Sequence, residues 1–293
     1  MADQLILPSG DIVKKSNALC RARWSIESVW EPRLVALLAS KIRAKDKDFQ
    51  VYKIHVSEIL QHGGGRDYKE IETVVDRVMS RVLTIYTETG WKKRHVFSSC
   101  DFDSGTGILE LGFHPDLKPH YLELQKNFAQ YDLLEFLMLP SIYSQRIFEI
   151  LKSYNGLPET TLKLAELHEM LNVPDSLKKD FAQFRRRVLE KAHKDICKTS
   201  QSMKYEWEPV KQGKAVIAIR FIFNKKAVAQ IEDRKRSKEI ARRSKNNNEC
   251  FKEALACATS KAAKGCARKD KSADVCAVCG QFNMLNLNLT KRV

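Results

Sequence analysis

Basic and amide side chains gather on one face of the segment from Leu177 to Val188. On a helical wheel of about 100° per residue, Leu177, Phe181, Phe184 and Val188 form an apolar stripe. The opposite arc carries Lys178, Lys179, Ala182, Gln183 and Arg186. Arginine can pair with guanine and glutamine with adenine, and a small residue between them permits close approach. This arc predicts a helix that reads base edges in the major groove of DNA. Arg185 and Arg187 flank the stripe, where we expect phosphate contacts.

A similar face occurs earlier in the chain. Its wheel buries Ile71, Val75, Val78 and Val82 and exposes Lys69, Thr73, Arg77, Ser80 and Arg81. We also expect DNA contacts from Lys211 and Lys214, which lie in a predicted β-hairpin. An exposed basic face is most often only a solvated face. Two matched faces in a chain with a formal charge of +15 favour a nucleic-acid partner.

The last fifty residues contain five of the eight cysteines, and these could hold a metal. Cys276 and Cys279 have the C-x-x-C spacing of a zinc knuckle, and Cys257 and Cys266 could complete a tetrahedral set. The spacing before the knuckle is unlike that of common zinc ribbons, so free cysteines are the alternative. We expect free thiols at Cys20, Cys100 and Cys197, which are scattered.

Enzymatic chemistry has little support in the sequence. A metal-dependent DNA-nicking enzyme would need a His-x-His metal pair. The nearest cluster is His114 and His120 in FHPDLKPH, whose spacing fits no standard metal template. The chain has no G-x-x-x-x-G-K-[ST] loop, and Gly63 to Gly65 reads as a turn. We therefore expect no catalytic site and no cofactor.

These candidate residues lie in two stretches that repeat the same elements. Arg33 matches Arg146 at an offset of 113, and Glu58 matches Glu166 at 108. The third-helix stripe Ile71, Val74 and Val78 matches Phe181, Phe184 and Val188 at 110, and Leu109, Leu111 and Phe113 match Ile217, Ile219 and Phe221 at 108. Offsets this long favour a duplicated domain over a solenoid, whose period is roughly 20 to 50 residues.

Each stretch reads as helix, turn, helix and β-hairpin, which is the winged-helix arrangement in an α+β fold. In the first stretch we expect helices over 24–44 and 67–86, a strand over 51–56, and a hairpin of 93–99 with 107–113. In the second we expect helices over 141–154, 162–171 and 176–197, and a hairpin of 203–209 with 214–223. The predicted domains are 1–132, 133–245 and a basic tail, 246–293.

The tail begins as a basic segment. Residues 225–271 hold 15 Lys and Arg against 6 Asp and Glu. We expect a helix over 225–244 and poor order beyond it, with either added affinity for phosphates or a merely solubilising role. No apolar run reaches the roughly 18 residues of a membrane span, and the N-terminus lacks the apolar core of a signal peptide. We expect a cytoplasmic protein.

Four segments carry a family resemblance, in this order: IVKKSNALCRARWSIESVWEPRLVALLASKI, LPSIYSQRIFEILKSY, FAQFRRRVLEKAHKDI and YEWEPVKQGKAVIAIRFIF. Together they resemble the iteron-binding plasmid replication initiators of the RepA, RepB and RepE class, over about residues 10–235. The resemblance implies that monomers bind iterons, the direct repeats of a plasmid origin, and that dimers bind an inverted repeat and repress their own promoter.

The resemblance also implies partners and roles. Host DnaA and the replicative helicase would be recruited in the bacterial cytoplasm, and chaperones would dissociate the homodimer. The second winged helix would be the main iteron reader, and the first would supply dimerisation and accessory DNA contacts. A dedicated repressor with the same two domains is the regulatory alternative, and a DNA-nicking rolling-circle initiator is the enzymatic one.

Overall fold

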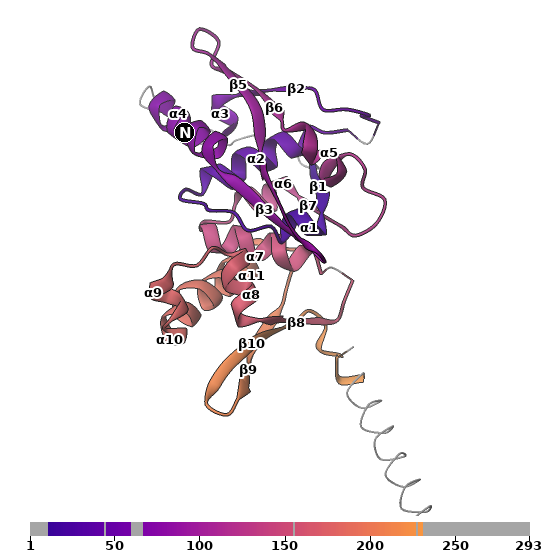
Figure 1. Cartoon of the computed structure of the whole chain (residues 1–293), viewed down its shortest axis with the longest axis vertical. Helices are drawn as coiled ribbons and strands as arrows, with labels where there is room; N and C mark the ends of the chain where they lie inside the picture. The colour runs from indigo at the N-terminus through magenta and orange to yellow at the C-terminus, as the bar shows by residue number, and fades with distance from the viewer. Residues whose placement is uncertain (1–10, 44, 60–66, 155, 227, 231–293) are drawn as a thin grey trace, which may run out of the picture. The chain divides into compact units, whose positions relative to one another are not determined.

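The computed structural model describes residues 11–43, 45–59, 67–154, 156–226 and 228–230. The described residues up to Lys225 form one compact unit (Figure 1). Their buried apolar side chains make a continuous hydrophobic core. The predicted tail helix over 225–244 and the candidate zinc ligands Cys257, Cys266, Cys276 and Cys279 lie outside the described residues, apart from the first positions of that helix. The expected boundaries at 132/133 and 245/246 remain a prediction.

The first copy is a helical group with a three-stranded sheet. Its elements are β1 (Ile12–Ser16), α1 (Asn17–Cys20), α2 (Trp30–Ser40), β2 (Val51–His55), α3 (Val56–Ile59), α4 (Asp67–Ser80), β3 (Val82–Thr87), β4 (Gly90–His95), β5 (Phe97–Asp103), β6 (Ile108–Phe113), η1 (Pro115–Leu117), α5 (Lys118–Tyr121), β7 (Phe128–Asp132) and α6 (Leu133–Leu137). Strands β1 and β7 pair antiparallel, so the two ends of this copy lie side by side.

The second copy is shorter and has one sheet. Its elements are α7 (Ile142–Lys152), β8 (Glu159–Lys163), α8 (Leu164–Met170), α9 (Asp175–Lys178), α10 (Phe181–Phe184), η2 (Arg185–Glu190), α11 (Lys191–Thr199), β9 (Glu206–Gln212) and β10 (Ala215–Ile222). Helix α11 packs on α7, and α8 packs on β10. Figure 1 shows the β9–β10 hairpin extending from this group of helices.

The two copies share a sheet topology. Strand order is β2-β6-β5 in the first and β8-β10-β9 in the second, with antiparallel neighbours throughout. In each copy a strand that precedes the second helix pairs with the last strand of the hairpin, so the hairpin is anchored beside the helices. The predicted duplication and winged-helix arrangement therefore match the observed strand order.

The register of the second hairpin differs from the sequence alignment. Ile54 pairs with Leu109 in the first copy, and Leu162 pairs with Ile219 in the second. Leu109 is therefore equivalent to Ile219 and not to Ile217, which is 45% exposed while Leu109 is buried. The offset of this strand is therefore 110, equal to that of the third-helix stripe, and the predicted offset of 108 was two residues out of register.

The predicted helix over 67–86 is too long. Helix α4 ends at Ser80, and Val82 to Thr87 forms strand β3, which pairs with β4 in a hairpin that the sequence reading missed. Val82 fits the helical stripe, yet it is 40% exposed, and Val75 is half-buried while Val74 is buried. The β-branched run alternates in burial, which is a strand pattern. The predicted hairpin strand over 93–99 is accordingly replaced by β4 and β5.

Other boundaries shift for identifiable reasons. Helix α2 begins at Trp30, not Trp24, because Glu31 Oε1 accepts from the backbone N–H groups of Glu27 and Ser28 at 3.0 and 2.8 Å and fixes the preceding turn. The helix expected from Leu162 begins at Leu164, because Leu162 belongs to β8. The second hairpin runs over 206–212 and 215–222, and it turns at Gly213 with φ +61, a conformation that favours glycine.

Candidate nucleic-acid interface

The candidate reading helix begins later than expected. Asp180 is extended, and its side chain accepts a hydrogen bond from the backbone N–H of Gln183 at 3.0 Å, which caps α10 at Phe181. The turn before it, α9, is separate, so the predicted helix over 176–197 is interrupted. Gln183 and Arg186 therefore lie in the first turns of the helix, where helix-turn-helix proteins contact base edges.

This interruption removes the two lysines from the arc around Arg186. Lys178 Nζ lies 3.2 Å from an Asp175 carboxylate oxygen and 3.7 Å from one of Glu169, and its side chain is 33% exposed. Lys179 is exposed and follows the end of α9. Both belong to the short turn that precedes the reading helix, and the charge of Lys178 is largely balanced locally.

The helix then changes type. Residues Arg185–Glu190 form a π-helical segment, η2, in which backbone hydrogen bonds join residues five apart. Arg185 Nε accordingly lies 3.1 Å from Glu190 Oε1, an ion pair between residues five apart. Leu189 is 1% exposed, although an uninterrupted α-helix would place it about 140° from Phe184. The sequence reading missed Leu189 because it assumed one period throughout.

The three consecutive arginines are exposed but differently engaged. Arg186 Nη2 donates to Gln183 Oε1 at 3.0 Å, so these two side chains lie together on the helix surface. Arg185 is held by Glu190. Arg187 makes no ion pair within the described ranges. The structure thus brings exposed Ala182 and Arg186 and half-buried Gln183 onto one face of the helix and leaves Arg187 at its side.

Buried side chains hold the reading helix against the rest of the second copy. The Phe184 ring is fully buried, and its centroid lies 4.5 Å from that of His168 in an edge-on arrangement. Burial, followed by the nearby charge of Lys178, lowers the pKa of His168, which favours the neutral ring. On α11, Asp195 accepts from Ser144 of α7 at 2.6 Å. The predicted stripe residues Leu177 and Val188 are buried, and Phe181 is half-buried.

The β9–β10 hairpin holds the other predicted contacts of this copy. Lys211 and Lys214 are both exposed on either side of Gly213. Arg220 of β10 bonds to Glu159 of β8, and its Nη1 lies 2.9 Å from Glu208 of β9, so one guanidinium ties the three strands together. The hairpin is therefore held to β8 by ion pairs and carries two lysines at its tip.

Family comparison identifies both copies. Residues 12–152 match the family described as Initiator Replication protein, WH1, and residues 163–223 match the family described as Initiator Rep protein, WH2. The chain belongs to the initiator replication protein family. Two winged-helix domains are thereby confirmed, as is the resemblance to replication initiators, and neither description is that of an enzyme. No curated protein sequence matches the initiator.

Solved structures resemble the initiator at low sequence identity. The Pi initiator protein in complex with iteron DNA shares 15% identity at a TM-score of 0.61, over 75% of this chain and 100% of that one. Domains 2 and 3 of RctB share 14% identity at a TM-score of 0.40, over 76% of this chain and 95% of that one. The match to the Pi initiator establishes the common fold.

The matching face of the first copy is largely paired. Arg77 Nε lies 3.5 Å from a Glu27 carboxylate oxygen, and Arg81 bonds to the same carboxylate. Thr73 and Ser80 are exposed, whereas the side chain of Lys69 lies outside the described residues. One carboxylate thus serves both arginines, and the predicted accessory face of the initiator presents less open positive charge than the second copy.

Three lysines that the sequence analysis did not single out lie on α11, which continues the reading helix beyond η2. Lys191, Lys194 and Lys198 of α11 are all exposed. A uniform α-helical wheel places Lys191 only about 20° from Phe184, within the predicted buried stripe. The exposure of these lysines therefore depends on the π segment, which cannot be recognised from the sequence.

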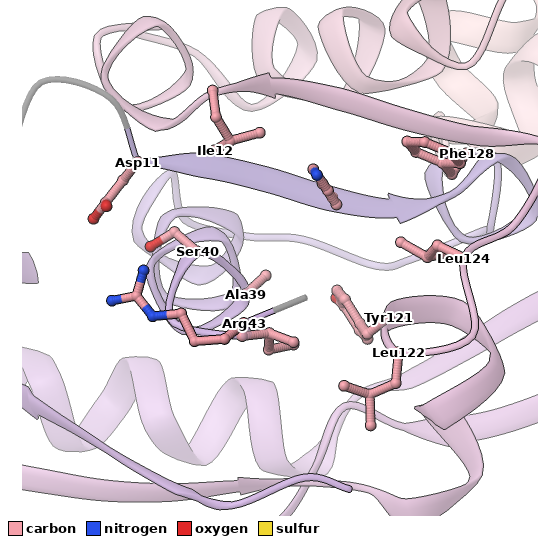
Figure 2. A pocket seen from close by; sticks show the side chains of 11 residues that line it. Asp11, Ile12, Ala39, Ser40, Arg43, Tyr121, Leu122, Leu124 and Phe128 are labelled. Atoms are coloured by element: carbon pink, nitrogen blue, oxygen red, sulfur yellow. The ribbon is translucent and has the colours of Figure 1, made fainter. Parts of the chain in front are cut away.

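The described part of the first copy contains a small cavity. The cavity, of about 330 Å³, lies between β1, α2 and the segment after α5. Figure 2 shows Asp11, Ser40 and Arg43 at one end of it and Tyr121, Leu124 and Phe128 at the other. Within the described ranges no group of three or more His, Cys, Asp or Glu side chains is placed to hold a metal ion. No helix in those ranges is both long and apolar enough to span a bilayer.

His114 and His120, the nearest histidine pair, have other roles. His114 Nδ1 accepts from the backbone N–H of Asp116 at 3.2 Å and begins η1. His120 Nδ1 lies 2.7 Å from Ser16 Oγ. Burial, with the charges of Lys92 and Arg94, lowers the pKa of His120. The two rings therefore support local structure.

Proposed function

We propose that the chain initiates plasmid replication by binding iteron DNA, with α10 and η2 in the major groove and the β9–β10 hairpin along the backbone. The observation that carries the proposal is the trio of exposed Ala182, half-buried Gln183 and exposed Arg186 at the start of a helix fixed by buried Phe184. Gln183 and Arg186 suit adenine and guanine edges. The related Pi initiator protein was crystallised with iteron DNA.

The phosphate contacts of this proposal come from side chains around the trio. Arg185 and Arg187 lie beside it on η2, and Lys211 and Lys214 lie at the hairpin tip. Lys178 and Lys179 of the preceding turn would approach the backbone and not the bases, because Asp180 separates them from the reading helix. Such contacts set register and affinity.

In this proposal the first copy makes accessory DNA contacts. Its face of Thr73, Arg77 and Arg81, with Lys69, would assist on DNA, and the same copy would mediate a homodimer that binds an inverted repeat and represses the promoter. Recruitment of DnaA and the replicative helicase, and dissociation of dimers by chaperones, follow from the resemblance to the family. The protein would act in the cytoplasm and would need no catalytic site or cofactor.

Two neighbouring substitutions test the reading face. Arg186→Ala should cost about 1–3 kcal/mol of specific binding and relax base preference, because a bidentate base contact is lost. Arg187→Ala should weaken binding to all duplexes alike, because a phosphate contact carries no sequence information. The measurement is fluorescence anisotropy on the DNA that flanks the gene and on a scrambled duplex. Equal losses on both duplexes for both variants would show that the face is wrongly assigned.

A further inference from the structure

The helix from Phe181 to Thr199 keeps one buried side only because η2 interrupts it. Phe184 and Val188 are fully buried before and within η2, and Ala192 and Ile196 are fully buried after it. An uninterrupted α-helix would turn Ile196 about 120° away from Phe184. Backbone bonding between residues five apart adds a residue to the turn and cancels this offset.

The same shift determines which residues face outward. Lys191 follows Arg186 by five residues, so the π segment places it on the side of Arg186 instead of in the core. Lys194 and Lys198 then follow at the spacing of one α-helical face. All three are exposed, and the Lys191 side chain is 52% exposed. Arg186, Lys191, Lys194 and Lys198 thus form a single row along the helix.

The acidic neighbours of this row are already occupied. Glu190 pairs with Arg185 at 3.1 Å. Asp195, whose side chain is 15% exposed, accepts from Ser144 at 2.6 Å, and Lys191 Nζ is 3.9 Å from it, at the limit of an ion pair. Lys194 and Lys198 have no ion pair within the described part of the chain. The row therefore presents open positive charge.

We infer that Lys191, Lys194 and Lys198 form a phosphate-binding row that is the second DNA contact of this helix, brought into line with Gln183 and Arg186 by η2. The inference rests on the proposed function. From Arg186 to Lys198 the helix rises about 18 Å, whereas the major groove is about 12 Å wide. A helix that reads bases with its first turns carries its last turns beyond the groove, over the sugar-phosphate backbone of flanking DNA.

Salt dependence tests the row. Each phosphate contact contributes about 0.9 to the slope of log affinity against log salt concentration, so K191A/K194A/K198A should reduce that slope by up to about 2.7. Specific and scrambled duplexes should be affected alike. The triple variant should fold, because the three side chains are exposed and alanine favours helices, and circular dichroism checks this. The matched control is K45A/K47A/K126A, three exposed lysines of the first copy.

Lysine acetylation with mass spectrometry tests the register itself. In the free protein Lys191 should react as readily as Lys194 and Lys198, whereas an uninterrupted α-helix would bury it. Addition of duplex should protect all three and leave Lys45 and Lys47 reactive. An unreactive Lys191 would overturn the inference and leave the proposed function intact. An unchanged salt slope in a triple variant that still prefers the flanking DNA would do the same. A wild-type protein that protects the row on every duplex but prefers none would overturn the proposed function and keep the inference.

Discussion

At the scale of single residues, a buried charge cluster ties the start of the chain to the second copy. Glu149 of α7 accepts from Arg146 Nη1 at 2.6 Å and from the Tyr131 hydroxyl at 2.8 Å, and it bonds to Lys15 of β1. Arg146 Nη2 also donates to the backbone carbonyls of Cys20 and Ala22 at 3.2 and 2.7 Å. Lys15, Arg146 and Glu149 are all buried.

Glu149→Gln should therefore lower the free energy of unfolding by about 3–5 kcal/mol, because two buried cations lose their counter-charge. Burial alone would raise the pKa of Glu149, but Lys15 and Arg146 outweigh it and the pKa is lowered. A lowered pKa stabilises the fold above about pH 4.3, the usual glutamate value, and this contribution is lost as the pH falls through the folded-state pKa.

Urea denaturation between pH 7 and pH 3 measures this effect, and Glu123→Gln, an exposed carboxyl, is the control. The wild type and the control should lose stability at acid pH more steeply than Glu149→Gln. Equal acid slopes in all three would contradict the assigned role of the cluster. The sequence marked Arg146 only as the counterpart of Arg33, because a partner such as Lys15, 134 residues from Glu149, leaves no local pattern.

At the scale of elements, the sequence predicts faces better than it predicts interruptions. Apolar periodicity identified Phe184 and Val188 as core and Arg186 as exposed, which the structure confirms. It missed η2, because a π turn is decided by how the helix packs and not by a repeating pattern. It also missed β3, because Val82 fits both a helical stripe and an alternating strand.

The cap of the reading helix gives a test at this scale. Asp180→Ala should cost about 0.5–2 kcal/mol at the start of α10 and loosen the backbone around Gln183, so specific DNA binding should fall. Asp175→Ala removes the same charge nearby, but Asp175 caps no helix. Losing a negative charge beside DNA should by itself favour binding. We therefore expect lower DNA affinity in Asp180→Ala and higher DNA affinity in Asp175→Ala. Amide exchange at Gln183 should become faster only in Asp180→Ala. Increased affinity in both variants would mean that the cap is unimportant.

At the scale of the whole molecule, the duplication predicted the architecture but not the difference in exposed charge between the two copies. Both copies have the strand order expected of equivalent winged helices, yet their third helices differ in charge. Glu27 pairs with both Arg77 and Arg81 in the first copy, while in the second copy α10 continues through η2 into the exposed basic row of α11. Glu27 lies between α1 and α2, far from α4 in the sequence, so no wheel of α4 could include it.

An initiator and a dedicated repressor would use the same reading helix, so an assay of plasmid maintenance is needed to separate them. We expect a plasmid whose only origin is this gene with its flanking DNA to be maintained. Arg186→Ala in that plasmid should abolish maintenance and raise promoter activity, since the same base contact is lost at both sites. Wild-type protein supplied from a second plasmid should restore both, and Glu123→Gln should change neither. Promoter derepression with unchanged maintenance would instead identify a repressor, because only an initiator couples the same helix to copying of the DNA.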